Sequence, residues 1–72
     1  MNGFAKMRIK AKLAQEATAA ALNVDRSTVA KWETGVAKPR ADKLISIANL
    51  YNCEIADLLS DDPDPSPTEE AV

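Results

Sequence analysis

The chain has 72 residues, which is enough for one small domain. Its single cysteine excludes an intramolecular disulfide, and without histidine it cannot form a zinc site of the usual Cys/His type, so we expect no metal and no cofactor. No apolar run is long enough to span a membrane, and the first residues lack the apolar core of a signal peptide. We therefore expect a cytoplasmic protein with no membrane partner, in which Cys53 is reduced and packed in the core.

Charge is unevenly distributed along the sequence. The net charge is −2, but residues 61–72 contribute five acids and no base. Residues 1–60 hold nine bases and six acids, a net charge of +3, which is compatible with a nucleic-acid partner. We predict one domain over residues 1–60 and an acidic, proline-rich, disordered tail over 61–72. The tail either solubilises the protein or competes with DNA for a basic surface.

A first helix is predicted over residues 3–12, with Asn2 as its N-cap. Apolar residues recur at i, i+3 and i+7, beginning with Phe4 and Met7, and form an inner stripe. Arg8 lies close to this stripe, which is an unusual place for a charge.

Two short helices with a break between them are predicted over residues 15–34. Residues 15–22 are rich in alanine and contain no glycine or proline, so they favour a helix. Asn23 then permits the left-handed backbone that a reversal of the chain needs.

The next helix is predicted over residues 26–33. Asp25 precedes it and can accept a hydrogen bond from the backbone N–H of Ser27 or Thr28. Val29 and Trp32 share one face, so we expect Trp32 in the core rather than as a base-stacking platform. Three polar residues point away from that face: Arg26, Ser27 and Lys31. Two helices of this kind form a helix-turn-helix pattern.

The rest of the domain is predicted to be helical as well. Gly35 ends the preceding helix as a left-handed C-cap, and residues 41–51 form an amphipathic helix. A fifth helix, about 55–59, supplies three apolar residues: Ile55, Leu58 and Leu59. Ile45 and Leu50 fall outside the inner faces. Together with the fifth helix they form either a dimer seam or isolated apolar positions on the surface.

One ordered series of residues resembles the lambda-repressor-like (Cro/repressor-type, or XRE-type) helix-turn-helix family: Gln15, Ala19, Leu22, Val24, Ser27, Thr28, Val29, Trp32, Glu33, Gly35 and Pro39. The resemblance extends from about Phe4 to Leu59 and implies a compact all-α fold of five helices. Three positions depart from the family pattern. Thr18 stands where the family usually has Leu, Asn23 where it has Gly, and Ala14 where it has a capping Ser or Thr.

The resemblance also implies a surface that contacts DNA. Base contacts are expected from the polar side of the third helix: Arg26, Ser27 and Lys31. Backbone contacts are expected from residues around it: Gln15, Thr28, Lys38 and Arg40. Thr28 could instead support the start of the helix, and Asp25 either caps the helix, which we favour, or accepts a bond from a cytosine. The family also pairs the positions of Arg8 and Glu33, so we expect a partly buried ion pair there rather than a solvated Arg8.

These features predict a sequence-specific, double-stranded-DNA-binding transcriptional regulator of the phage-repressor type. Its third helix would lie in the major groove, and two copies would bind neighbouring half-sites as a homodimer. The alternative is a protein-interaction module on the same fold, either an antitoxin that masks a toxin or a phage modulator that docks on a repressor. An enzyme is not expected, because the sequence has no histidine and no glycine-rich phosphate loop.

Overall fold

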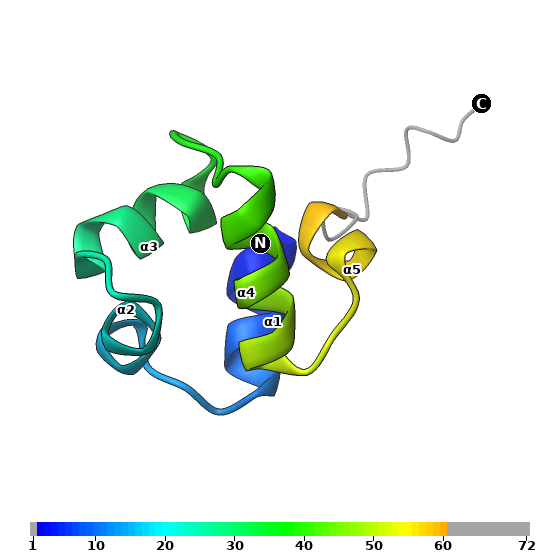
Figure 1. Cartoon of the computed structure of the whole chain (residues 1–72), viewed down its shortest axis with the longest axis horizontal. Helices are drawn as coiled ribbons and strands as arrows, with labels where there is room; N and C mark the ends of the chain where they lie inside the picture. The colour runs from blue at the N-terminus through cyan, green and yellow to red at the C-terminus, as the bar shows by residue number, and fades with distance from the viewer. Residues whose placement is uncertain (1, 61–72) are drawn as a thin grey trace, which may run out of the picture.

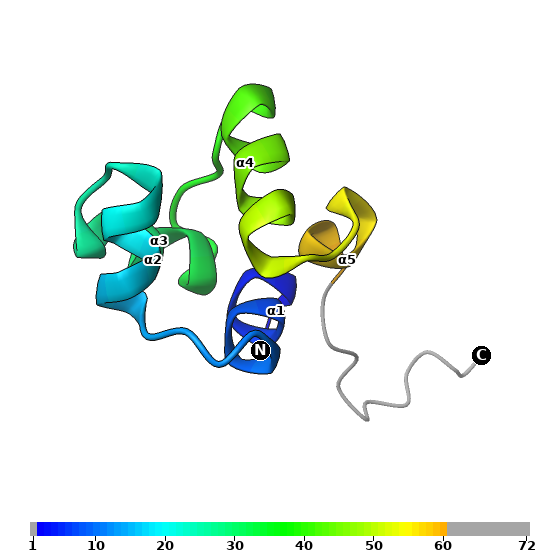
Figure 2. The ribbon, with the colours of Figure 1, turned by 60° about the horizontal axis from the view of Figure 1, so that its bottom comes forward.

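Five α-helices and no strand are present in residues 2–60, the part of the chain that the computed structural model describes. The helices are α1 (Gly3–Lys10), α2 (Gln15–Leu22), α3 (Arg26–Thr34), α4 (Ala41–Tyr51) and α5 (Ile55–Leu59). In Figure 1, α2 and α3 lie on one side of the molecule, α5 lies on the other, and α1 and α4 lie between them. Figure 2 shows the same order from a second direction. The predicted all-α, five-helix fold is confirmed, and the predicted tail lies outside the described residues.

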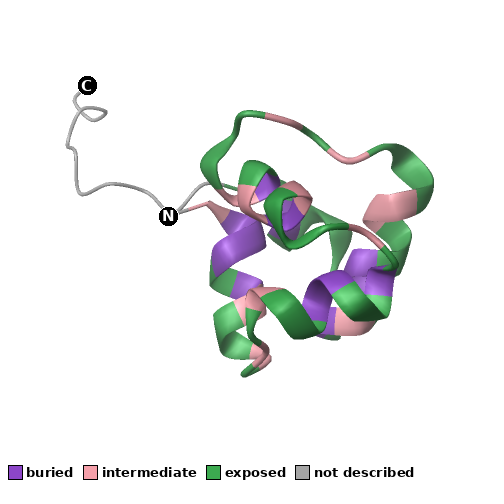
Figure 3. Ribbon diagram, turned by 90° about the vertical axis from the view of Figure 1, so that its left-hand side faces the viewer, coloured by how far each residue is buried: buried purple, intermediate pink, exposed green. Residues whose placement is uncertain are grey.

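A single hydrophobic core joins all five helices, and buried residues line their inward sides in Figure 3. Val29 of α3 and Ile47 of α4 are fully buried, and Leu58 of α5 is nearly so. Trp32 is 5% exposed and packs against the ring of Phe4, with ring centroids 6.5 Å apart. The apolar face of α3 is therefore anchored in the core.

The N-terminal end of α1 is held at two points. A Cβ atom at Gly3 would collide with the carbonyl oxygens of Asp57 and Leu58, so the close packing of α1 on α5 requires glycine here. Asn2 caps α1 as predicted, because its Oδ1 accepts a hydrogen bond from the backbone N–H of Ala5 at 3.2 Å. Its Nδ2 also donates to the backbone carbonyl of Trp32 at 2.8 Å, which ties the start of α1 to α3.

The structure differs from the prediction at the end of the first helix and in the burial of two apolar side chains. Helix α1 ends at Lys10, because Lys12 adopts a left-handed backbone with a φ of 63°. Leu50 is half-buried against the core rather than outside it, since it lies where α1 and α4 converge. Leu59 is 61% exposed, because it follows the buried Leu58 and lies about 100° further around the helix. Ile45 is 53% exposed, in agreement with its predicted place outside the inner face.

Candidate nucleic-acid interface

The turn between α2 and α3 is short and left-handed. Asn23 has φ 60° and ψ 46°, and the N–H of Val24 donates to the carbonyl of Ala19 at 2.9 Å. Val24 then packs, partly buried, against the core. This geometry closes α2 and directs the chain into α3 within three residues.

Helix α3 begins without the side-chain cap that the sequence predicts. Asp25 occupies the N-cap position with an extended backbone, but its side chain makes no capping hydrogen bond. The N–H of Thr28 instead donates to the main-chain carbonyl of Asp25 at 2.9 Å. The predicted carboxylate cap at Ser27 or Thr28 is therefore not formed.

The two faces of α3 differ sharply in burial and polarity. Val29 and Trp32 face the core, whereas the polar residues of the opposite side are exposed. We call these exposed residues the reading surface: Arg26, Ser27 and Lys31. The structure thus brings together on one face the three residues expected to contact bases, and it leaves Thr28 half-buried beside them.

An ion pair between Arg8 and Glu33 joins α3 to α1. Arg8 donates from Nε to Glu33 Oε2 at 2.6 Å and from Nη2 to Oε1 at 3.2 Å. Its Nη1 also donates to the carbonyl of Leu13 at 2.7 Å. The Arg8 and Glu33 side chains are only 15% and 7% exposed. The hydrogen bond to Glu33 raises the pKa of Arg8, against the opposing effect of burial.

Gln15 extends this ion pair to the reading surface. Its Nε2 donates to Glu33 Oε1 at 3.0 Å, and its Oε1 accepts from Arg26 Nη1 at 3.3 Å. Sequence reasoning paired Arg8 with Glu33 but missed these two bonds. The available signal was that Gln15 and Arg26 open two consecutive helices that pack on each other.

The loop after α3 carries the other two predicted backbone contacts. Gly35 ends α3 with φ 83°, as predicted, and no atom lies near the space that a Cβ would occupy. Lys38 and Arg40 follow on either side of Pro39, and both are exposed. They are therefore accessible to a ligand that approaches from outside the loop.

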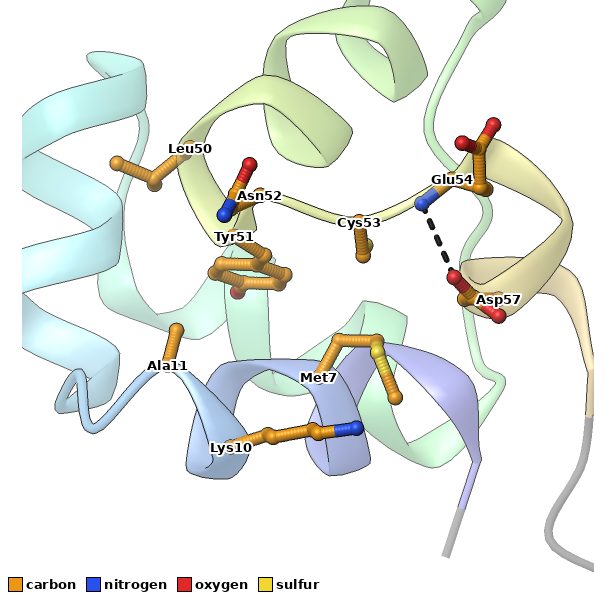
Figure 4. A pocket seen from close by; sticks show the side chains of 9 residues that line it. All are labelled: Met7, Lys10, Ala11, Leu50, Tyr51, Asn52, Cys53, Glu54 and Asp57. Atoms are coloured by element: carbon orange, nitrogen blue, oxygen red, sulfur yellow. Dashed lines mark hydrogen bonds between the residues drawn. The ribbon is translucent and has the colours of Figure 1, made fainter.

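An open hollow of about 680 Å³ lies away from the reading surface, where α1 and the end of α4 meet the start of α5 (Figure 4). Lys10 lines it, and the backbone N–H of Glu54 donates to Asp57 Oδ2 at 3.0 Å. Cys53 lies in the same wall and is half-buried rather than fully buried as predicted. Burial raises the pKa of the Cys53 thiol, and the negative charges of Asp57 and Glu54 add to the rise. The thiol is therefore protonated at neutral pH and a poor nucleophile.

Within residues 2–60, no group of three or more His, Cys, Asp or Glu side chains could hold a metal ion. In the same part of the chain, no helix combines the length and the apolar character that crossing a membrane requires.

Helices α2 and α3 pack on each other across a left-handed turn, and α3 buries its apolar face and exposes its cationic face. This arrangement defines a helix-turn-helix DNA-binding domain. Residues 4–58 match the family described as Helix-turn-helix (HTH_3), and the chain belongs to this Cro/C1-type, XRE family. The family is one of DNA-binding domains and not of enzymes. No curated protein matches the sequence closely enough to be compared with it.

Proposed function

We propose that this protein is a sequence-specific, double-stranded-DNA-binding transcriptional regulator of the phage-repressor type, which inserts α3 into the major groove. The observation that carries the proposal is the orientation of α3. Val29 and Trp32 fix the helix to the core, and the reading surface is exposed on the opposite side. A major groove about 12 Å wide admits a helix presented in this way.

The residues of the reading surface have the donors that base recognition needs. The Arg26 guanidinium can donate two hydrogen bonds to O6 and N7 of one guanine, and Lys31 can reach the same acceptors. The hydroxyl of Ser27 both donates and accepts, so it discriminates less between bases. We expect most of the sequence preference to come from Arg26 and Lys31.

Phosphate contacts on both sides of α3 would set the orientation of the domain on DNA. Ala14 has no side-chain acceptor for the first N–H groups of α2, so these backbone groups, including that of Gln15, are open to a phosphate. Thr28, half-buried beside the reading surface, would make a second phosphate contact. Lys38 and Arg40 would each neutralise about one phosphate from the loop.

Two copies on neighbouring half-sites would supply the specificity that one small domain lacks. Leu59 of α5 is 61% exposed and borders an apolar groove of about 280 Å³ that also includes Trp32 and Pro39. This apolar surface favours contact between protein copies. Since its proposed partner is DNA, the protein would act in the cytoplasm of a bacterial or phage-infected cell.

Selection of duplexes from a random DNA pool tests the proposal. The wild-type protein should enrich one motif, and Arg26→Ala should relax the preference at one position by about 1–3 kcal/mol. Lys10→Ala removes a positive charge from the hollow remote from α3, so this matched control should retain the motif. If folded wild-type protein enriches no motif but co-purifies with a protein from its native host, the protein-interaction module is the better assignment.

A further inference from the structure

We propose that residues 61–72 compete with DNA for the loop between α3 and α4. In the free protein, Asp61 and Asp62 would pair with Lys38 and Arg40 of this loop until the phosphates of a duplex displace them. This inference rests on the proposed function, in which the two cations contact phosphates. Residues 61–72 lie outside the described part of the chain, but the surface that they would meet is described.

Helix α5 ends at the same groove as this loop. Leu59, the last residue of α5, lines the apolar groove of about 280 Å³ together with Lys38 and Pro39. Only Ser60 separates Leu59 from Asp61 in the sequence. One residue spans at most about 3.5 Å of extended chain. The segment 61–72 therefore begins close to the loop.

The loop offers two positive charges that are available for pairing. Lys38 and Arg40 are exposed, and within residues 2–60 no side-chain hydrogen bond or ion pair involves either of them. Asp42, the nearest acid along the described chain, does not pair with them either. Residues 61–72 carry five acids and no base. The loop and the segment that begins beside it are therefore complementary in charge.

The hollow at the start of α5 is a poorer surface for an acidic segment. Lys10 is a cation in its lining, but Glu54 and Asp57 line it as well. Two carboxylates beside one ammonium group give this hollow a net negative charge, which repels further acids. The apolar groove is lined by Lys38 and by no acid of the described chain. Charge therefore favours the groove and the loop as the place where residues 61–72 bind.

Attachment to the same chain makes a weak contact effective. An exposed ion pair contributes little to stability, but a short tether gives the attached partner a millimolar effective concentration. A duplex presents many phosphates and would displace the two carboxylates. Because Lys38 and Arg40 would contact the DNA backbone and not the bases, this competition lowers the affinity for every sequence by the same factor. Displacement would also clear the apolar groove for the second copy on a neighbouring half-site.

Two matched pairs of substitutions distinguish this contact from simple repulsion between the segment and DNA. Asp61→Asn with Asp62→Asn, the aspartate variant, removes two charges close to the loop. Glu69→Gln with Glu70→Gln, the glutamate variant, removes two charges further along the chain. Each protein is titrated at low salt with the selected duplex and with a duplex of random sequence. We expect the aspartate variant to bind both duplexes about fivefold more tightly, and the glutamate variant to gain about twofold or less. Equal gains in the two variants would overturn the proposal, because repulsion alone would explain them.

A double-mutant cycle identifies the surface that the two aspartates meet. Lys38→Gln with Arg40→Gln removes both cations of the loop, so the gain from the aspartate substitutions should disappear in this background. Lys10→Gln with Lys12→Gln removes two exposed charges elsewhere, so the gain should remain in this matched control. A fivefold gain that persists without the loop cations would overturn the proposal.

A measurement on the free protein tests the contact without DNA. The amide resonances of Lys38 and Arg40, which are remote from the substitutions in sequence, should shift in the aspartate variant and stay in place in the glutamate variant. Added salt should shift them in the wild type in the same direction, because screening weakens the contact. Loop resonances that do not change would overturn the contact. A wild-type protein that binds no duplex, with loop resonances that shift, would refute the proposed function and the competition with it, but not the contact. Thermal unfolding of each variant establishes that it is folded.

Discussion

Thr18 places a hydroxyl group in the fully buried part of the core. The residue is fully buried, and its Oγ1 has no hydrogen-bond partner of good geometry among residues 2–60. Tyr51 lies within reach of this hydroxyl: burial raises the pKa of Tyr51, and a hydrogen-bonding contact with Thr18 partly opposes that rise, although its geometry is poor. An unpaired buried hydroxyl costs free energy that a methyl group would not.

Thr18→Val should therefore stabilise the protein. The substitution keeps the branched shape of the side chain and removes a poorly satisfied buried polar group, which is worth about 1 kcal/mol. For a domain of this size, the midpoint of thermal unfolding should rise by about 4–8 °C. Thr34→Val, at an exposed position on α3, serves as the matched control and should change the midpoint little. A midpoint at or below that of the wild type in Thr18→Val would mean that the hydroxyl is satisfied in solution.

At the scale of the elements, helix ends determine much of the architecture. Each of the first four helices of the described chain is followed within two residues by a left-handed backbone: Lys12, Asn23, Gly35 and Asn52. After each, the next N–H donates to the carbonyl five residues earlier, over 2.9 to 3.2 Å. This arrangement satisfies the last carbonyls of the helix and turns the chain sharply. It keeps the connections short enough for five helices to share one core.

How well these ends could be predicted depended on which residue occupies the left-handed position. Gly35 marked its helix end clearly, and the two asparagines tolerate positive φ better than most residues. The predicted bounds of α2, α4 and α5 therefore agree with the structure, and α3 is one residue longer than predicted. Lys12 gives no such signal, so the predicted first helix extended two residues too far. Lysine has no preference for this conformation, so the residue type alone does not predict it.

The same argument predicts that Lys12→Gly stabilises the protein. A lysine with a φ of 63° carries a steric cost that glycine does not, although glycine also gains freedom in the unfolded chain. The net gain should be about 0.5–1 kcal/mol, measured by urea unfolding. Lys12→Ala removes the same charge but keeps a Cβ, so it should show no comparable gain. Equal midpoints for these two variants would contradict strain at this position.

At the scale of the whole molecule, the sequence predicted which surface faces outward and the Arg8–Glu33 pair, but not the bonds that join that pair to the outward surface. Helical phase alone separated Arg26 and Lys31 from Trp32, because each position on a helix points in a fixed direction. The bonds from Gln15 to Glu33 and Arg26 depend on how three helices approach one another, and helical periodicity carries no information on that approach. The DNA contacts of these residues remain predictions.

The Arg8–Glu33 pair joins α1 to α3, which are separated in the sequence by α2. Arg8 bonds to α3 through Glu33 and to the segment between α1 and α2 through the carbonyl of Leu13. Glu33 in turn accepts the bond from Gln15 at the start of α2. Both charged side chains are largely withdrawn from water, so removal of either leaves the other buried without its partner.

Arg8→Met should consequently destabilise the whole domain by about 3 kcal/mol, at the lower end of the range for stranded buried charges because Arg8 keeps some exposure. Glu33→Met should cost a similar amount, whereas the double variant should lose much less than the sum, since neither charge is then stranded. Urea unfolding of the four proteins measures the coupling, and Lys10→Met on the same helix controls for the loss of a surface charge. Additive losses in the double variant would mean that the two charges act independently, and the pair would then not link α1 to α3.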